Sequence, residues 1–320
     1  MDPLARPLVP GAGCRRLRFG LFLSGSGSNA ERVIERLRSL PEPPCEPVVL
    51  VTDVPETSRA RELGRLYGLP VVEHDIRAFY AAHSLPRVSL ATPRGVEVRE
   101  RWTDGLRARL APYTLDFGVF AGFVPLTNLT ADLPCLNVHP GDLTYLKDGK
   151  RYLVGLHTVP IERAILEGLD DLRSSVIQAL PYSGGDDMDN GPLLGLSGPV
   201  PMDLQGAGLD ELRRQFEARP KLRPKEGYGD RLEQLARSHQ EALKVQGDWV
   251  VLPRVVAAVA AGHTGTDREG QVFSRVGARW LPVETVVYNP DGSRELRLRP
   301  PAAAVPAEGC PAAQLPAAAG

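Results

Sequence analysis

Short apolar runs alternate with amphipathic helical patterns over the N-terminal part of this chain. After an apolar run at 18–23, Val33, Ile34 and Leu37 recur at the spacing that places them on one face of a helix. Strands that alternate with helices in this way predict a parallel sheet with helices packed on its faces. The predicted elements are a strand at 18–23, a helix from residue 29, a strand at 47–52, a helix at 55–67 and a strand at 69–73.

The alternation resumes after a polar, poorly patterned stretch at 74–94. It favours one α/β domain over residues 18–201, with a doubly wound, mostly parallel, Rossmann-like sheet. The further predicted elements are a helix at 96–110, strands at 116–121 and 135–138, a helix at 158–167, and strands at 175–180 and 192–200.

The pattern changes beyond residue 201. Residues 202–247 are rich in Arg, Glu, Gln and Leu, and Pro220 and Pro224 interrupt them. Because proline ends a helix, this segment predicts two helices and a connector, as a helical insertion outside the sheet.

Residues 248–299 predict a C-terminal part that packs on the first domain. An apolar helix at 249–261 and a terminal hairpin at 279–299 make up most of it. We expect residues 1–17 to be disordered, and also residues 300–320, which are mostly Ala and Pro.

The charge balance narrows the classes of partner. The 320 residues carry a formal net charge of −1, with 24% charged and 42% hydrophobic residues. This balance is ordinary for a globular protein and provides no basic surface for nucleic acid or for a membrane. We therefore expect a small-molecule substrate, and a monomer or homodimer.

The cysteines and the N-terminus indicate the compartment. Cys14, Cys45, Cys135 and Cys310 lie far apart and form no Cys-x-x-Cys pair, so we expect no metal site. No apolar run approaches the roughly 20 residues that a membrane span needs, and residues 1–18 lack the apolar segment of a signal peptide. We therefore expect a cytoplasmic protein.

The segment GSGSNA at 25–30 lies between a predicted strand and a predicted helix. It loosely fits the G-x-G-x-x-A fingerprint, and Asp53 follows where a ribose-binding acid would lie, which predicts an NAD-dependent oxidoreductase. A plain strand-to-helix turn is another interpretation. The favoured one is a phosphate monoester site at a helix N-terminus, because hydroxyl and amide donors join the backbone N–H groups. Its residues are Ser26, Gly27, Ser28 and Asn29.

Three polar groups are expected at the carboxyl ends of strands. Asn137 and His139 are two residues apart, so both side chains point to one side, and Pro140 then leads the chain out of the sheet. Alone, this pair is more typical of a capping histidine and a turn. Asp189, in a loop rich in Gly and Asx residues, is expected to face inward. An amide, an imidazole and a carboxylate together suit the attack of an amine on a carbonyl.

At this point the sequence resembles the folate-dependent formyltransferases, and most closely the glycinamide ribonucleotide formyltransferases of purine biosynthesis. The resemblance runs from about residue 18 to residue 200. It rests, in order, on SGSGSN at 24–29, AGF at 121–123, N-x-H-P at 137–140, GLHT at 155–158, SV at 175–176 and D-x-x-D-x-G-P at 186–192.

The resemblance implies a fold, a reaction and a site. The formyl group of 10-formyltetrahydrofolate would lie beside Asn137, whose amide donates to the developing oxyanion. His139 would handle a proton or stabilise charge, and Asp189 would orient it and favour its cation. The substrate amine would attack the formyl carbon directly, without a metal or a covalent enzyme intermediate.

The same resemblance implies binding residues. The pterin would contact backbone groups of the 182–189 loop, including Asp186, and of Val124, Pro125, Leu126 and Thr127. Arg99 resembles an arginine that faces the ligand cleft, although a solvated helix face is an equal alternative. Asp248 is the best candidate for a carboxylate that contacts the substrate ribose.

Departures from the family lie around the acceptor. Gly141 to Thr144 replace the usual Ser-Leu-Leu-Pro, and the loop at 145–154 is longer than usual, with Lys147, Lys150 and Arg151. A sugar-nucleotide N-formyltransferase, a 10-formyltetrahydrofolate hydrolase and a catalytically silent relative therefore stay open. The formyl-transfer residues themselves match.

Overall fold

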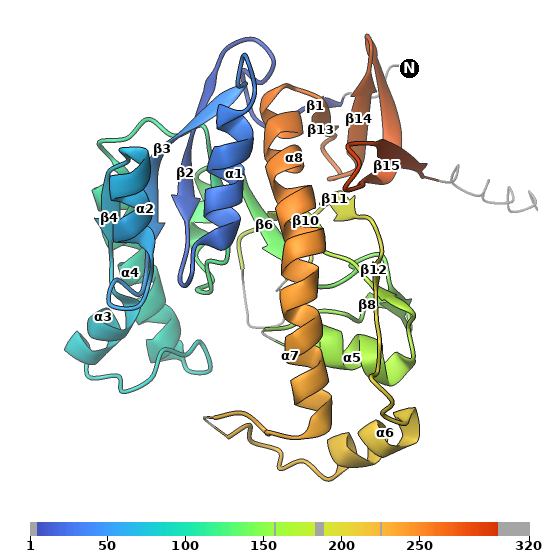
Figure 1. The fold of residues 1–320 in the computed structure, drawn as a ribbon. Coiled ribbons are helices and arrows are strands. Elements are labelled where there is room, and N and C mark those ends of the chain that lie inside the picture. Colours follow the sequence, from blue (N-terminus) through green and yellow to red (C-terminus); the bar gives the residue numbers. More distant parts are fainter. Residues whose placement is uncertain (1–4, 157, 183–188, 225, 300–320) are drawn as a thin grey trace, which may run out of the picture.

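The computed structural model describes residues 5–156, 158–182, 189–224 and 226–299. Twelve of its strands form one sheet, with helices on both faces (Figure 1). The strands are β1 (Arg6–Pro7), β2 (Leu17–Phe22), β3 (Cys45–Thr52), β4 (Val71–Glu73), β5 (Phe117–Phe120), β6 (Cys135–His139), β10 (Ser175–Ala179), β11 (Leu193–Ser197), β13 (Thr264–Thr266), β14 (Val272–Val276), β15 (Arg279–Tyr288) and β16 (Arg294–Leu298).

The half of the sheet that carries the predicted motifs is parallel. Its order is β4-β3-β2-β5-β6, and every neighbouring pair is parallel. β10 and β11 then pair antiparallel, while β15 runs parallel to β11. This mixed sheet confirms the predicted doubly wound, Rossmann-like class.

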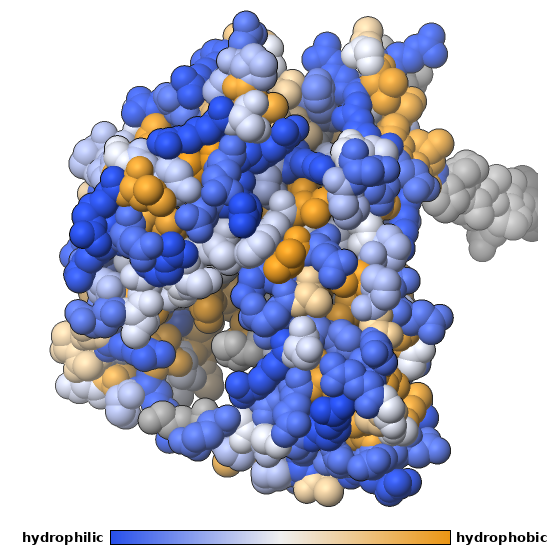
Figure 2. All heavy atoms as spheres, viewed as in Figure 1, coloured by the Kyte–Doolittle hydropathy of each residue, from blue (hydrophilic) through white to orange (hydrophobic). Residues whose placement is uncertain are grey.

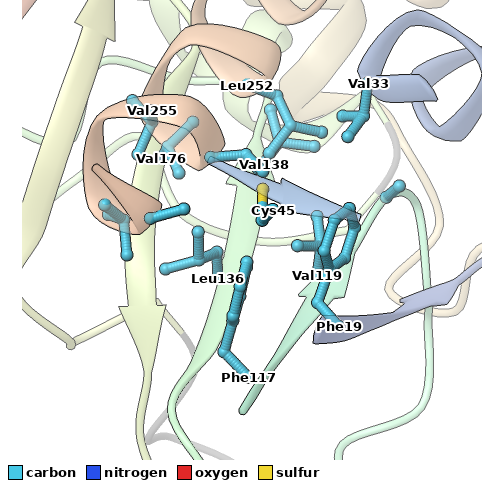
Figure 3. Packing of buried hydrophobic residues seen from close by; sticks show 14 of the residues in the cluster. Phe19, Val33, Cys45, Phe117, Val119, Leu136, Val138, Val176, Leu252 and Val255 are labelled. Carbon is cyan, nitrogen blue, oxygen red and sulfur yellow. The ribbon is translucent and has the colours of Figure 1, made fainter. Parts of the chain in front are cut away.

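Helices α1 (Ser28–Arg38), α2 (Ala60–Tyr67) and α8 (Trp249–Ala260) cover one face. Helices α3 (Ile76–Ala82) and α4 (Pro93–Leu110) cover the other. In Figure 3 side chains of β2, β5 and β6 pack against α1 and α8, with Phe19, Leu136 and Leu252 fully buried. The apolar periodicity of each element is therefore explained by burial on the sheet.

A helical part extends below the sheet in Figure 1. Helices α5 (Val159–Glu167), α6 (Leu209–Glu217) and α7 (Arg231–Leu243) share an apolar cluster of their own. The π turn η3 (Lys244–Asp248) joins α7 to α8 without a break. The two helices and connector at 202–247 are thus present, but the boundary that we predicted after residue 247 falls inside one continuous helical rod.

The shorter elements border the site or close turns. They are η1 (Asn128–Ala131), the hairpin of β7 (Leu146–Lys147) and β8 (Lys150–Arg151), and the pair of β9 (Asp171–Leu172) and β12 (Val200–Pro201).

Several expectations need correction. The expected disorder of 1–17 is wrong for residues 6–12, because β1 pairs with β13 and Leu8, Val9 and Ala12 are buried. The polar stretch at 74–94 contains α3, whose N-cap Asp75 accepts a hydrogen bond from the backbone of Ala78. The tail at 300–320 lies outside the described residues. None of the described helices is long and apolar enough to cross a membrane.

Candidate active site

A cavity of about 540 Å³ opens at the carboxyl ends of β2, β5 and β6. Figure 2 shows the molecule hollowed on this side, between the part that holds α3 and α4 and the part that holds α7. Its polar lining residues come from five separate segments and include Ser26, Asn29, Thr127, Asn137, His139, Asp189, Lys244 and Asp248. Its volume lies within the range of small-molecule sites, roughly 300–1,000 Å³.

The structure brings the three predicted catalytic residues together. Along β6, Leu136 and Val138 face α8 while Asn137 and His139 face the opposite side, as the two-residue repeat of a strand requires. His139 Nδ1 lies 3.2 Å from Asp189 Oδ2, and these side chains are 4% and 10% exposed. An imidazole is thus paired with a carboxylate in a cavity that the Asn137 amide also lines.

His139 also has a partner on its second ring nitrogen. Nε2 lies 2.7 Å from the backbone carbonyl oxygen of Leu153, in the segment that follows β8. Sequence reasoning missed this contact, since a backbone carbonyl has no residue-specific signal.

Asp189 is held through its backbone. Its φ is +61°, a left-handed conformation that costs a non-glycine residue about 1 kcal/mol or more. Arg151 Nη1 donates to the carbonyl oxygen of Asp189 and, at 2.9 Å, to that of Gly191. Burial lowers the pKa of Arg151, and the charge of Asp189 opposes this shift. The loop arginine noted in the sequence therefore supports the His139–Asp189 pair.

The glycine-rich loop leads into α1, which begins at Ser28 with Gly27 as its N-cap. The first N–H groups of a helix have no partner within it, and they favour an anion. Ser26 and Asn29 line the cavity, and the carbonyl of Ser26 accepts a hydrogen bond from Arg59 at 3.2 Å. The helix N-terminus thus lies at the cavity, whereas Gly27 and Ser28 of the predicted phosphate site are not among the described residues that line it.

Replacing Gly27 with alanine tests this loop. The φ of Gly27 is +66°, and a Cβ would lie 2.6 Å from Leu63 Cδ1 and 2.7 Å from Leu23 Cδ1, both buried. We expect a loss of about 1–3 kcal/mol in the free energy of urea unfolding. Gly25→Ala is the matched control, because nothing lies within 4 Å of its Cβ position; equal losses in the two variants would contradict this account.

Asn29 and Asp248 form a buried polar group at the cavity. Asn29 Nδ2 donates to Asp248 Oδ2 at 3.0 Å, and Ser174 Oγ donates to Asp248 Oδ1 at 2.6 Å. Burial raises the pKa of Asp248, and the hydrogen bonds from Ser174 and Asn29 oppose the shift. The Asn29 amide, which we expected to donate to a phosphate, is therefore directed at Asp248.

This arrangement leaves one acceptor for a ligand. Asn29 Oδ1 is buried and has no hydrogen-bond partner among the described residues. An unpaired buried acceptor costs about 1–3 kcal/mol, so an O–H or N–H donor bound in the cavity would relieve that cost. Asp248, placed in the cavity wall by the π turn η3, lies beside this position.

The acid that supported a dinucleotide site has another role. Asp53 is buried, and its Oδ1 accepts a hydrogen bond of 2.5 Å from Ser24 Oγ. Ser24 Oγ in turn accepts one from the backbone N–H of Val124 at 3.0 Å. Burial raises the pKa of Asp53. Its carboxylate thus ties two loops together and does not line the cavity, which leaves the NAD interpretation without its ribose acid.

The expected pterin loop lines the cavity with Val124, Pro125, Leu126 and Thr127. Arg99 is not among the described residues that line it, so the predicted cleft-facing arginine is not found, and the solvated alternative is wrong too because Arg99 is buried. Arg99 is buried on α4, and its Nη1 donates to the carbonyl of Leu126 at 2.7 Å. Arg99 thus holds the loop at 124–127 in place through this hydrogen bond. Asp186 lies outside the described residues.

Sequence reasoning missed the contribution of the helical insertion. Gln240 and Glu241 of α7 and Lys244 of the π turn line the cavity opposite the loop after β5. Lys244 Nζ donates to Glu241 Oε2 at 2.5 Å. In the sequence these residues are polar, as on a solvent-exposed helix face, and therefore give no signal of a site. The packing of α7 on α5 brings them to the cavity.

Comparison with known proteins finds no matching family model and no matching curated protein. Solved structures do match. A phosphoribosylglycinamide formyltransferase from Coxiella burnetii is 16% identical, with a TM-score of 0.54 over 86% of this chain and 100% of that chain. One from Anaplasma phagocytophilum is 17% identical, with a TM-score of 0.52 over 85% and 99%.

A formyltetrahydrofolate deformylase from Pseudomonas syringae pv. tomato is 13% identical, with a TM-score of 0.53 over 82% of this chain and 67% of that chain. The chain has the formyltransferase fold. The resemblance identified in the sequence is therefore confirmed at the level of the fold. Within the formyltransferase fold of this chain, Asn137, His139 and Asp189 line one cavity.

Proposed function

We propose that this protein transfers a formyl group from 10-formyltetrahydrofolate to the amine of a phosphorylated small molecule. Glycinamide ribonucleotide, an intermediate of purine biosynthesis, is the favoured acceptor. The observation that carries the proposal is one cavity in which Asn137 and the His139–Asp189 pair stand near a helix N-terminus suited to phosphate.

The cavity suits the folate donor. Its walls include apolar side chains, and the backbone of the loop after β5 offers polar groups to a heterocycle, a combination typical of small-molecule sites. The loop is held in place by Arg99 and by Ser24. The apolar lining residues include Phe120, Phe123, Val124, Leu126, Ile177 and Leu180.

The donor would supply a formyl carbon that is open to attack by an amine. Asn137 can then donate its amide N–H groups to the oxygen of that carbon as negative charge develops there. His139 adds positive charge on the same side, and Asp189 stabilises that charge. In the net reaction the amine loses one proton and the donor nitrogen gains one.

The acceptor would bind through its phosphate and its polar body. The N-terminus of α1 favours the phosphate, and Asn29 Oδ1 with Asp248 offers acceptors to hydroxyl groups nearby. This pairing of an anion site with oxygen acceptors suits a phosphorylated sugar that carries an amine.

An acceptor screen tests the proposal. The protein is supplied with 10-formyltetrahydrofolate and, in separate reactions, with glycinamide ribonucleotide, an amino-sugar nucleotide or water alone, and release of tetrahydrofolate is followed. We expect turnover with glycinamide ribonucleotide and little with water. Equal turnover with water alone would assign the hydrolase reaction, which the deformylase of similar fold is named for.

Thermal shift separates the proposal from the oxidoreductase alternative. We expect the folate donor to raise the melting temperature and NAD to leave it unchanged, because Asp53 is already bonded to Ser24. Stabilisation by NAD alone would overturn the proposed function.

A further inference from the structure

The segment that departs from the family pattern touches the catalytic pair. The β7–β8 hairpin and the residues that follow it, up to Val154, lie against His139 and Asp189 through Leu153 and Arg151. The pattern of these contacts indicates a function for this segment in the proposed formyl transfer.

Gly141 allows the first contact. A Cβ at position 141 would lie 2.4 Å from the carbonyl oxygen of Leu153 and 2.9 Å from His139 Nε2. Any residue larger than glycine would therefore separate the carbonyl from the imidazole. Glycine in place of the usual serine therefore permits the contact between Leu153 and His139.

Arg163 of α5 fixes the carbonyl in its position. Its Nη1 donates to the carbonyl oxygens of Tyr152 and Val154, at 2.7 and 3.0 Å. These are the two neighbours of Leu153, so their carbonyls turn toward α5 while that of Leu153 turns toward His139. The guanidinium also lies over the Tyr152 ring, 5.2 Å from its centroid. The orientation of the segment is thus set by α5.

The two contacts of His139 determine where its hydrogens lie. A carbonyl oxygen can only accept, so Nε2 must carry a hydrogen. The carboxylate of Asp189 also accepts, so the proton on the other side lies between Nδ1 and Oδ2. Neither ring nitrogen then has a lone pair open to the cavity.

The charged groups around His139 come from three segments. Asp189 lies at Nδ1, Arg151 binds the backbone of Asp189, and the buried Asp248 lines the same cavity. One carboxylate therefore pairs with the imidazole, and the Arg151 guanidinium donates to the backbone carbonyls of Asp189 and Gly191. Both ring nitrogens of His139 thus meet hydrogen-bond acceptors, and an imidazole with a hydrogen on each nitrogen satisfies both.

We propose that the segment 151–154, held by Arg163, is a positioning device that fixes His139 as a hydrogen-bonded cation. The inference rests on the proposed function and deepens it. His139 then supplies positive charge to the formyl oxygen and does not take the proton of the attacking amine. As the new C–N bond forms and the bond to the donor nitrogen breaks, water in the cavity carries that proton to the donor nitrogen.

Two variants loosen the device without replacing a catalytic side chain, and Arg163→Met does so at a residue bonded to Tyr152 and Val154. Gly141→Ala displaces the Leu153 carbonyl, and Arg163→Met releases its neighbours. We expect kcat to fall about 10- to 100-fold in both, because small misplacements of a catalytic group cost this much, with each KM within about twofold. Arg163→Lys, which keeps a donor, should recover part of the loss. Lys150→Met, at an exposed position of the same hairpin, should match the wild type.

Nitrogen NMR of the histidine side chains provides a readout that needs no substrate. His139→Ala identifies the His139 signals among those of the six histidines. In the wild type we expect a slowly exchanging hydrogen on Nε2, and we expect it to exchange rapidly in Gly141→Ala and Arg163→Met. An Nε2 without hydrogen in the wild type, or variants that keep both the signal and kcat, would overturn the inference. If the wild type transfers no formyl group, the proposed function fails. The NMR result still decides whether the segment 151–154 positions His139.

Discussion

The Asp189→Asn protein is expected to transfer formyl groups about 10²- to 10⁴-fold more slowly than the wild type. Asp189 Oδ2 lies 3.2 Å from His139 Nδ1, and both side chains are largely buried. An amide has the same shape but no charge, so the imidazolium loses its counter-charge in a place where water cannot replace it. His139→Ala, which removes the imidazole itself, is expected to be at least as slow.

The measurement is kcat/KM for the acceptor at saturating folate donor, with the unfolding temperature followed in parallel. Asp170→Asn is the matched control, since it makes the same chemical change at an exposed position. Its rate should equal that of the wild type. An Asp189→Asn protein that is folded and turns over within twofold of the wild type would show that the carboxylate has no part in the reaction.

The Arg219→Met protein is expected to lose about 3–5 kcal/mol in the free energy of unfolding. Arg219 is 7% exposed, and it bridges Glu162 of α5, at 2.5 Å, and Asp230 at the start of α7, at 2.7 Å. Its guanidinium lies 4.1 Å from the centroid of the Tyr228 ring. Removing the arginine leaves two carboxylates without their cation at the joint between α5, α6 and α7.

Urea unfolding followed by circular dichroism measures this loss. Arg214→Met is the control within the same insertion, because Arg214 is exposed and such surface substitutions change stability by about 0.5 kcal/mol or less. Losses of similar size in the two variants would contradict a special function for the buried pair. Because α7 continues into the cavity wall, we also expect Arg219→Met to raise KM for the acceptor.

The pH dependence of that loss follows from Asp230. The hydrogen bond from Arg219 lowers the pKa of the Asp230 carboxyl, and burial opposes this effect. A carboxyl whose pKa is lower in the folded state stabilises the fold above its unfolded pKa, and this stability disappears as the pH falls. The difference between wild type and Arg219→Met should therefore be largest near neutral pH and shrink below about pH 4.

Much of the site could be predicted from the sequence, because its signals are local. The two-residue repeat of a strand placed Asn137 and His139 on one side, and the loop of Gly and Asx residues placed Asp189 at their edge. The glycine-rich loop was likewise predicted at its observed position, directly before α1. The structure corrected the direction of individual groups, such as Asn29, whose amide donates to Asp248.

Other features could not be predicted, because partners distant in the chain create them. The pairing of β1 with β13 joins segments from opposite ends of the described chain, and neither strand has a strong pattern of its own. Arg99 faces the Leu126 carbonyl through the packing of α4, which its helical position alone leaves open. The contact between Leu153 and His139 uses a backbone atom that every residue has.

The sequence by itself determined the α/β class, the parallel half of the sheet and the three groups suited to formyl chemistry, since periodicity and turn residues act over a few neighbouring positions. Only the tertiary structure decided what each group faces. Three features depend on contacts between segments that are distant in the chain. They are the contact of the Leu153 carbonyl with His139, the hydrogen bond from Arg151 to the Asp189 carbonyl, and the α7 residues that line the cavity. Such contacts arise from packing that no local pattern encodes.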